Sequence, residues 1–450
     1  MRNLVSTQDI EVEPVRVVVV GGGAAGVIAA THVLRAADAE HPVDVRIIEK
    51  GAHLGPGLAY GTDHPLLTLN NFAARLSAVD GDPDHLLRWC ADRDLPAAPT
   101  SFLQRGLYGR YLADVLDGTG VPPGSMLRRN RGEVTDVRDD GAGLAVDLSD
   151  GWSVRADKVV LALGNPPPRR QPAYEHRGDR YVPDPWAVDL PERIGPAEDV
   201  LLLGTGLTML DVVATLHQAS PDTRFTAVSR HGLLPAAHKP GSLRLHDLFH
   251  PGAGSLDELI TRVRARVREA EDVSGDWRDV VDSVRACAND LWRGLSLADQ
   301  DRFVAEVARH WEIARHRMSP EMAERVEHLQ RAGTLQVARV EEVDVSGFDL
   351  VVNCTGPSPV PTRGWNPLVD TLLDRGTIRP HRLGLGLDLD PHGRVVGADD
   401  RAHPHIHVVG AARRGLEWEV AAIPDLRVQA SRLATRLLRA DDDLSTVLPA

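Results

Sequence analysis

One short design occurs twice in this chain, and it constrains the fold more than any other feature. A valine-rich run, Val15–Val20, leads directly into the glycine turn Gly21–Gly26 and then into an alanine-rich helical stretch. The second copy has the strand pattern Asp199–Leu203 and the turn Gly204–Gly206. Strand, glycine turn, helix and strand form a βαβ unit of about 30 residues with buried parallel strands. Two such units, roughly 180 residues apart, predict an α/β fold with two Rossmann-like dinucleotide-binding domains.

Length and charge agree with a multidomain globular protein. The chain has 450 residues, beyond the size at which a single hydrophobic core stops growing. Its hydrophobic content of 42% and charged content of 26% are ordinary for a globular protein. The net charge of −13 argues against a nucleic-acid binder and against docking on anionic lipid. We therefore expect neither a nucleic-acid nor a membrane partner.

Cysteine usage and the N-terminal region indicate a cytoplasmic protein. There are only three cysteines, Cys90, Cys287 and Cys354, and no CxxC motif, so the sequence offers no disulfide framework and no dithiol redox pair. Acidic residues near the start, among them Asp9 and Glu11, differ from the basic beginning of a signal peptide.

The pattern between the second βαβ unit and the C-terminal region is helical. Capping signals at Ser255, Ser296 and Ser319 precede apolar residues at helical spacing, and Gly333 ends the last of these stretches. We expect an all-helical insertion at about 250–333 within the second domain. The predicted division is 1–195 for the first part of the first domain, 196–357 for the second domain and 358–450 for the C-terminal part of the first domain.

The first turn fits GxGxxG. Gly21 permits the tight turn, Gly23 allows a pyrophosphate to approach the backbone, and Gly26 lets the helix pack on the strand. Glu49 ends the next strand, where an acid binds ribose hydroxyls. An incidental glycine-rich turn is the alternative interpretation.

The second turn departs from this pattern. It keeps Gly204 and Gly206, but Met209 stands where the third glycine would be. The strand that follows ends on Arg230, which suits a 2′-phosphate and favours NADPH over NADH, although an arginine facing solvent at the sheet edge is the alternative. A flavin needs a reduced nicotinamide to charge it, so two dinucleotide folds imply FAD in the first and NADPH in the second.

With these motifs, the chain resembles the FAD/NAD(P)-binding oxidoreductases with two dinucleotide-binding domains, distant relatives of flavin-containing monooxygenases and ornithine/lysine N-hydroxylases. Besides the two turns, the resemblance is carried by further segments along nearly the whole chain: Leu54–Tyr60, Leu69–Ala73, Ser229–Pro235, Trp311–Pro320, Cys354–Pro357, Val409-Gly410 and Leu416–Glu419. The family's loop often has Val and Pro after its Asn, whereas Asn71 and Phe72 follow Asn70 here.

The resemblance implies roles for several of these positions. Leu163-Gly164 and Thr355-Gly356 become the crossings between the domains, and Gly410 lies by the flavin ribityl–phosphate. A helix starting near Ile423 points its N-terminus at the isoalloxazine, and Leu54–Ala73 folds over the flavin with Asn70 in contact. The expected cofactor-binding residues are Gly21, Gly23, Ala24, Ala25, Gly26, Glu49, Lys50, Asn70, Val134, Gly164, Gly204, Gly206, Thr208, Arg230, Thr355, Gly356, Gly410 and Glu419.

Catalytic residues are not evident from the sequence. Asn70, His316 and Arg317 are candidates, although His316 and Arg317 lie in a predicted helix where solvent exposure is the default. His403, His405 and His407 share one face of a strand, yet a solvent-facing run is favoured over a metal site, and we expect no metal.

Three functional hypotheses follow. The leading one is an FAD-dependent, NADPH-using monooxygenase that activates O₂ at the flavin C4a position and oxidises a small polar molecule, for example by hydroxylating an amine nitrogen. The second is an NAD(P)H-dependent reductase, dehydrogenase or oxidase without oxygen insertion. The third is a non-catalytic flavin-binding partner, to which Met209 in the second turn points. The substrate and the oligomeric state are left open.

Overall fold

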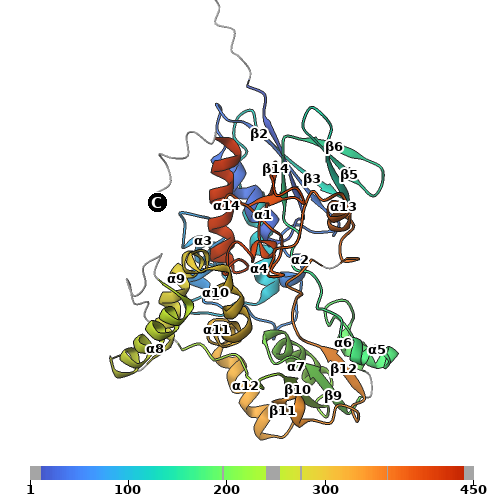
Figure 1. Cartoon of the computed structure of the whole chain (residues 1–450), viewed down its shortest axis with the longest axis vertical. Helices are drawn as coiled ribbons and strands as arrows, with labels where there is room; N and C mark the ends of the chain where they lie inside the picture. Colours follow the sequence, from blue (N-terminus) through green and yellow to red (C-terminus); the bar gives the residue numbers. More distant parts are fainter. Residues whose placement is uncertain (1–11, 195–196, 240–253, 274–275, 362, 440–450) are drawn as a thin grey trace, which may run out of the picture.

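The first domain is built on a six-stranded sheet. The computed structural model describes residues 12–194, 197–239, 254–273, 276–361 and 363–439. The strand order is β13-β14-β7-β1-β2-β3, and every neighbouring pair is parallel except β13 and β14 (Figure 1). The strands are β1 (Val15–Val20), β2 (Val43–Glu49), β3 (Met126–Arg131), β7 (Lys158–Leu161), β13 (Arg394–Val396) and β14 (Ala402–Val408).

Helices from the two ends of the chain cover one face of this sheet together. Helix α1 (Ala24–Ala36) packs against α14 (Ile423–Leu438), and α4 (Arg105–Asp117) packs beside α1. Their apolar side chains share one core with β1 and β2. The other face packs on a three-stranded antiparallel sheet, β4-β5-β6, and on α13 (Pro367–Arg375). These strands are β4 (Val134–Asp139), β5 (Leu144–Leu148) and β6 (Ser153–Ala156).

The second domain is a five-stranded parallel sheet in the order β11-β10-β9-β12-β8. Helices α7 (Leu207–Ala219) and α12 (Pro320–Arg331) contribute to its core. Strand β8 lies in this sheet although it precedes residue 196, where the sequence analysis begins the second domain. The strands are β8 (Tyr181–Val182), β9 (Asp199–Leu203), β10 (Arg224–Ser229), β11 (Leu335–Arg339) and β12 (Leu350–Asn353).

The described part of the predicted insertion is helical. It consists of α8 (Leu256–Val273), α9 (Arg278–Gly294), α10 (Leu297–Arg302), a π-helical turn η3 (Phe303–Val307) and α11 (Ala308–Arg315), followed by α12. The predicted caps are confirmed, since the Ser296 and Ser319 side chains accept hydrogen bonds from Asp299 N–H and Met322 N–H. Helices α9, α10 and α11 lie between the two domains in Figure 1.

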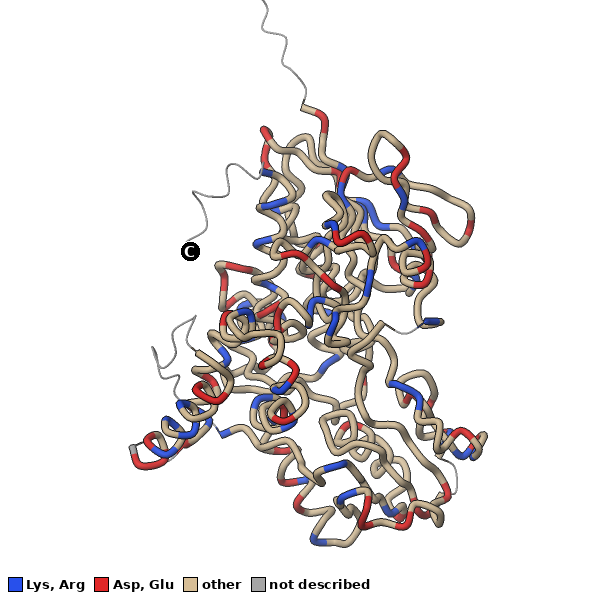
Figure 2. The backbone as a smooth tube through the Cα atoms, viewed as in Figure 1, with Lys and Arg blue, Asp and Glu red and all other residues tan. Residues whose placement is uncertain are grey.

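Short elements connect these layers. They are the helices α2 (Gly57–Tyr60), α3 (His85–Ala91), α5 (Pro172–Glu175) and α6 (Leu190–Ile194), with the 3₁₀ turns η1 (Ala73–Arg75), η2 (Gly178–Arg180), η4 (Val340–Glu342) and η5 (Ala411–Arg413). Acidic and basic residues are interspersed over both domains (Figure 2). Among the helices of the described residues, none has the length and apolar character needed to cross a bilayer. The predicted fold class, two Rossmann-like domains with a helical insertion, is confirmed.

Candidate dinucleotide and active site

The first glycine turn lies at the carboxyl ends of β1, β2 and β7, where open α/β sheets bind ligands. Gly21 has φ of +102°, and a Cβ there would meet Ala162 O at 2.3 Å, so only glycine fits. A Cβ on Gly26 would lie 1.9 Å from Gly21 O, which shows the close packing of helix on strand. A Cβ on Gly23 meets only Gly57 Cα, at 3.6 Å. The turn is therefore closed on the sheet side and open at Gly23.

The N-terminus of α1 is ready for an anion. Its N-cap, Gly23, supplies no side-chain hydrogen bond, so the first N–H groups, including those of Ala24 and Ala25, are left for a ligand. Glu49 stands beside them, with Oε2 accepting from Gly22 N–H at 2.6 Å and Oε1 from Gly51 N–H at 2.7 Å. These bonds fix the carboxylate at the place where a dinucleotide ribose is bound. The residues present fit the adenosine pyrophosphate half of FAD.

The segment after Glu49 lies against this turn. Gly55 N–H donates to Gly22 O at 2.8 Å, and Gly57 lies next to Gly23. Further on, Asn70 is half-buried and its carbonyl accepts from His238 Nε2 at 3.0 Å, the assignment of the proton depending on the tautomer. Thus the segment Leu54–Ala73 runs from the first glycine turn to the second domain.

Gly410 lies where β14 meets the helix pair. It has φ of +85°, and its N–H donates to Gln429 Oε1 of α14 at 3.0 Å. A Cβ there would lie 3.3 Å from the Ala25 side chain of α1. The close approach of Gly410 to the first turn puts it beside the expected pyrophosphate position.

The second turn has the same open geometry. Gly204 has φ of +111° and a Cβ there would clash with Cys354 O at 2.5 Å, whereas a Cβ on Gly206 meets nothing within 4 Å. Gly206 is the N-cap of α7 and offers no side-chain bond to the first N–H groups, which include that of Thr208. Met209 is fully buried in the core of this domain, so the third-glycine position is filled by packing. Despite Met209, the turn therefore keeps the open backbone geometry that a pyrophosphate site requires.

Arg309 is a contact to this turn that the sequence analysis missed. Its Nη2 donates to Thr205 Oγ1 at 3.1 Å and to Leu233 O at 2.6 Å. Burial, and then the neighbouring Arg230, lowers its pKa. Arg230 itself is exposed at the end of β10. Two guanidinium groups therefore lie near the sheet edge at which the sequence predicts a 2′-phosphate.

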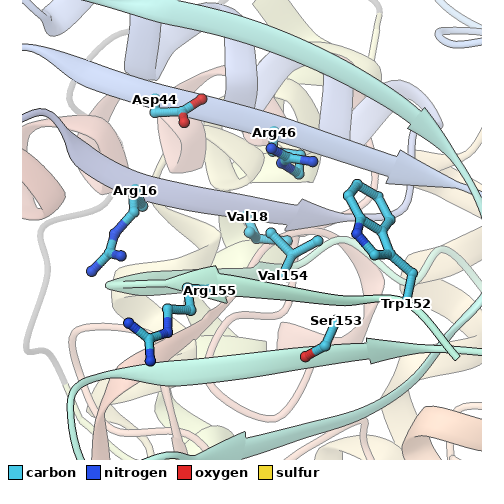
Figure 3. A pocket seen from close by; sticks show the side chains of 8 residues that line it. All are labelled: Arg16, Val18, Asp44, Arg46, Trp152, Ser153, Val154 and Arg155. Carbon is cyan, nitrogen blue, oxygen red and sulfur yellow. The ribbon is translucent and has the colours of Figure 1, made fainter.

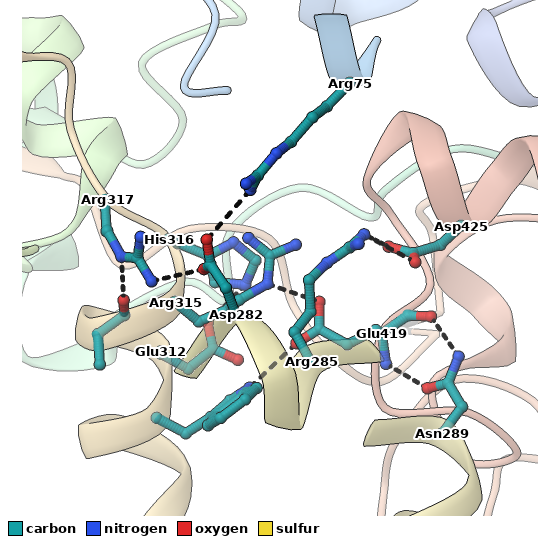
Figure 4. Close-up of polar contacts among 12 residues, drawn as sticks. Arg75, Asp282, Arg285, Asn289, Glu312, Arg315, His316, Arg317, Glu419 and Asp425 are labelled. Carbon is teal, nitrogen blue, oxygen red and sulfur yellow. Dashed lines mark hydrogen bonds and ion pairs between the residues drawn. The ribbon is translucent and has the colours of Figure 1, made fainter. Parts of the chain in front are cut away.

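Side chains of the helical insertion form hydrogen bonds and an ion pair with the loop that precedes α14 (Figure 4). Trp311 Nε1 donates to Glu419 Oε1 at 3.0 Å, and Asn289 bonds both backbone groups of Glu419. Arg315 Nε lies 3.4 Å from Glu419 Oε2. Burial raises the pKa of the Glu419 carboxyl, but Arg315 and other cations outweigh this and leave it below its usual range. Glu419 is thus a buried anchor for the insertion.

A second contact joins the insertion to the start of α14. Arg285 Nη2 lies 2.9 Å from Oδ1 of Asp425, in the first turn of that helix. Burial raises the pKa of Asp425 to about 6, against the opposing effect of Arg285. The end of α14 at which a flavin ring is expected is therefore covered by α9.

Arg317 differs from its expected exposure. Helix α11 ends at Arg315, and Arg317 is 1% exposed, with Nη2 donating to Asp282 Oδ1 at 2.7 Å. Arg75 Nη1 reaches the other Asp282 oxygen at 3.2 Å. Burial raises the Asp282 pKa, but Arg317 and Arg75 outweigh it and lower the net value. The default of solvent exposure is wrong because this segment turns inward after α11.

His316 is half-buried at the end of α11. Its Nε2 lies 3.6 Å from Glu312 Oε2, and burial lowers its pKa. Glu312 also pairs with Arg414 of the loop before α14. His316 and Arg317 therefore lie in the zone between insertion, first domain and second domain that Figure 4 displays.

His238 completes this zone from the second domain. It is 7% exposed and packs against Phe72 and Phe102 in tilted ring contacts, with centroids 5.0 and 5.3 Å away. Burial lowers its pKa to about 4, so the imidazole is neutral. Phe72, one of the residues that departs from the family pattern, thus forms part of the domain contact.

An ion pair between a half-buried arginine and a buried carboxylate also joins the two domains. Arg105, the first residue of α4, lies with Nη2 2.7 Å from Oδ2 of Asp211 on α7. Burial raises the pKa of Asp211 to about 6, and Arg105 opposes this shift. The sequence carried no signal for this pair, because the two residues are about a hundred positions apart in unrelated patterns.

The remaining expected cofactor residues are spread over the same edge and its surroundings. Gly164 and Gly356 both have positive φ and open space at Cβ, and the crossings run side by side through a Pro168–Pro357 bridge. Thr355 is exposed and donates to Asn353 Oδ1. Lys50 is exposed, 3.8 Å from Glu133, and Val134 is the buried first residue of β4 in the antiparallel sheet.

The three alternating histidines are more enclosed than expected. All lie within β14, and His407 is 5% exposed, so a wholly solvent-facing run is wrong. His405 Nδ1 lies 3.2 Å from Lys158 Nζ, and His403 Nε2 lies 3.6 Å from Asp139 Oδ2. Within the described part of the chain, no group of three or more His, Cys, Asp or Glu side chains is arranged to hold a metal ion.

Comparison with known proteins gives this geometry a context. Residues 18–166, the first domain up to its first crossing, match the family described as FAD-NAD(P)-binding. No curated protein matches the sequence. Among solved structures, an ornithine hydroxylase from Pseudomonas aeruginosa is similar over 94% of this chain and 99% of its own, with a TM-score of 0.60 and 14% identity. The chain has the fold of this hydroxylase.

Two further structures show how widely the fold is used. An L-lysine 6-monooxygenase from Pseudomonas syringae matches over 94% of this chain and 98% of its own, with a TM-score of 0.59 and 17% identity. A bacillithiol disulfide reductase from Bacillus cereus matches over 94% and 99%, with a TM-score of 0.50 and 15% identity. The same fold thus occurs in proteins of different chemistry, and the side chains of the site determine which chemistry this chain supports.

Proposed function

We propose that the protein is an FAD-dependent, NADPH-using monooxygenase that oxidises a small polar molecule with O₂. The observation that carries the proposal is the helical insertion, which contacts both the loop before α14 and the second glycine turn. Through Glu419 and Asp425 it covers the expected flavin end of α14, and through Arg309 it reaches the nicotinamide turn. Oxygen transfer from a flavin requires such an enclosed site, because water diverts the reactive intermediate.

Different residues would bind the cofactor and stabilise the charge on its ring. Gly21, Gly23, Gly26 and Glu49 hold the FAD adenosine and pyrophosphate, and Gly410 holds the region between pyrophosphate and ring. When bound, FAD accepts a hydride from NADPH and supplies the reducing power to activate oxygen. The N-terminus of α14 stabilises negative charge on the ring edge. The carboxylate of Asp425, which is paired with Arg285, partly offsets the positive charge at that end of the helix.

The zone around His238 and Arg317 would receive the substrate. His238 is neutral and packs against the rings of Phe72 and Phe102, and Arg75, Arg317 and Asp282 would form a charged wall. A polar substrate, such as an amine, is compatible with a wall that contains charges of both signs. We place the enzyme in the cytoplasm, where NADPH is supplied.

A reductase without oxygen insertion is the second candidate, favoured by the disulfide reductase among the similar structures. Dithiol chemistry requires paired thiols. This chain has only Cys90, Cys287 and Cys354, and Cys354 is buried with its pKa raised. A disulfide-reducing mechanism through the protein's own thiols is therefore disfavoured.

The test starts with the flavin spectrum of the purified protein and its anaerobic reduction by NADPH. The reduced protein is then mixed rapidly with ¹⁸O₂ and a panel of amines, and products are analysed for the label. Labelled product with stoichiometric NADPH oxidation supports monooxygenation. Reduction followed only by hydrogen peroxide release with every substrate favours the oxidase alternative. Failure of both NADPH and NADH to bleach the flavin contradicts both enzymatic readings.

A further inference from the structure

A basic cavity lies away from both glycine turns. It has a volume of about 360 Å³, within the range of small-molecule sites. Two structural units line it: the adjacent strands β7, β13 and β14, and the last turn of α14 with the residue after it. Lys158, His407, Arg436 and Arg439 are the lining residues that matter here.

The charge of this cavity is unusual for an acidic chain. Among the described residues that line it there is no Asp or Glu. Arg394, at its rim, is neutralised by Asp390, which accepts from its Nε at 2.7 Å. Among the described residues, no carboxylate forms a hydrogen bond with Arg436: its Nη1 donates to the His392 carbonyl at 3.3 Å, and its buried Nε meets no acceptor within that part of the chain. The cavity therefore concentrates cationic groups around a buried donor without an acceptor.

His407 adds a second unsatisfied group. It is 5% exposed, and both ring nitrogens are buried without a hydrogen-bond partner in the part of the chain that the structure describes. Burial, followed by Lys158, Arg394 and Arg436, lowers its pKa to about 3, with Asp390 as the opposing charge. A neutral imidazole still has one N–H to donate, and leaving it unpaired is costly. An acceptor ligand would satisfy this group.

A second arginine-lined cavity, of about 260 Å³, is a balanced cavity, meaning that neighbouring side chains pair with its cationic groups (Figure 3). There Arg16 makes a two-point contact with Asp157, at 3.0 and 2.6 Å. Arg155 lies 3.5 Å from Asp140, and Arg46 lies over the Trp152 ring and donates to Asn130. Local residues thus satisfy the cations of that cavity, in contrast to Arg436 and His407.

Helix-dipole compensation explains only part of the basic cavity. Basic residues are favoured in the last turn of a helix, which accounts for Arg436. It does not account for Lys158 and His407, which come from separate strands and face the same space. Cations that converge from different elements, together with unpaired donors, are the usual composition of an anion site.

We propose that this cavity binds the phosphate group of a small phosphate monoester, at a site separate from both dinucleotide turns. Lys158, Arg436 and Arg439 would balance the two charges of the phosphate, and His407 would donate to one of its oxygens. The remaining volume would take the organic part of the ligand. The inference is independent of the monooxygenase proposal, because none of these residues belongs to the dinucleotide or substrate zone.

The test uses the full chain, saturated with FAD, in a phosphate-free buffer of constant ionic strength. Thermal unfolding is followed while inorganic phosphate, glycerol phosphate or succinate is added. We expect the two phosphates to raise the unfolding temperature and succinate to have little effect. Arg436→Gln and Lys158→Gln should weaken phosphate binding about tenfold or more, the effect of losing one charge-assisted hydrogen bond.

Two controls locate the binding. Arg155→Gln in the balanced cavity and Arg230→Gln at the nicotinamide turn should respond to phosphate as wild type does. Four results would each overturn the proposal. Two concern the variants: an equal response to phosphate in all of them, or loss of the response in Arg230→Gln. Two concern wild type: an effect of succinate equal to that of phosphate, or no effect of phosphate at about 10 mM.

A second measurement covers variants that do not fold. In wild-type protein with ¹⁵N-labelled histidine rings, phosphate should shift the signal of one buried imidazole. The same titration in Arg439→Gln, whose side chain is exposed, should require a higher phosphate concentration. Histidine signals that do not move in wild type contradict the site.

Discussion

Two glycines in the first turn should respond to alanine in opposite ways. A methyl group on Gly26 would lie 1.9 Å from Gly21 O, far inside contact distance. A methyl group on Gly23 would have Gly57 Cα at 3.6 Å as its nearest neighbour, an ordinary contact, and its φ of −72° suits alanine. Gly26→Ala should therefore damage the fold, and Gly23→Ala should damage only ligand binding.

The expected magnitudes follow from these distances. Overpacking against backbone costs about 3 kcal/mol or more, so Gly26→Ala should remove a large share of the domain's stability. Gly23→Ala should change the free energy of unfolding of the flavin-free protein by no more than about 1 kcal/mol. Its methyl group occupies the open side of the turn and displaces the pyrophosphate. Losing one charge-assisted hydrogen bond, about 1.5–3 kcal/mol, weakens FAD binding roughly 10- to 150-fold.

The assay compares urea unfolding of the flavin-free proteins with titration of each by FAD, followed by flavin fluorescence. Gly206→Ala in the second turn, where a Cβ meets nothing within 4 Å, is the matched control and should bind FAD as wild type does. If Gly23→Ala binds FAD with wild-type affinity, or if Gly26→Ala is as stable as wild type, the assignment of the two glycines is refuted.

Other outcomes follow from the domain contacts. Arg230→Ala should raise KM for NADPH about 10-fold or more and leave KM for NADH nearly unchanged, whereas Arg309→Ala, which loosens the turn itself, should raise both; equal responses of the two cofactors in Arg230→Ala would disprove its contact with the 2′-phosphate. Arg105→Met should destabilise the protein by about 3–5 kcal/mol by leaving Asp211 unpaired, and the added change Asp211→Leu should restore much of that loss in a double-mutant cycle. Burial raises the pKa of Asp211 to about 6, above its value in the unfolded chain, so deprotonation of Asp211 lowers the stability of wild type as pH rises from about 4 to 6. The free energy of unfolding of Asp211→Asn should therefore increase by up to about 3 kcal/mol relative to wild type over that range. A difference in urea-unfolding free energy that does not change with pH would contradict this.

The sequence was sufficient for the repeating parts of the fold. Strands β1 and β9 have the predicted ends, and β2 ends at Glu49 as predicted, because buried parallel strands and glycine turns depend on local patterns. The caps at Ser296 and Ser319 were equally local. The insertion was predicted as a helical unit, but α9 did not stand out, since its start at Arg278 has no side-chain cap.

The contacts between distant elements could not be predicted in this way. Arg309 meets Thr205 across about a hundred residues, and Arg317 is buried because Asp282 and Arg75 meet it from two other elements. From the adjacent sequence alone, a charged residue at the end of a helix is predicted to be exposed to solvent. His407 is a similar case, because its enclosure depends on α14, which comes later in the chain.

The buried links between the two nucleotide domains have a consequence for turnover. Arg105 with Asp211, and His238 with the Asn70 carbonyl, would each be broken if the domains rotated apart. Separating a buried charge from its partner costs several kcal/mol, so a wide hinge motion in each cycle would be slow. If the proposed function holds, we therefore expect the oxidised nicotinamide to leave without a wide separation of the two domains.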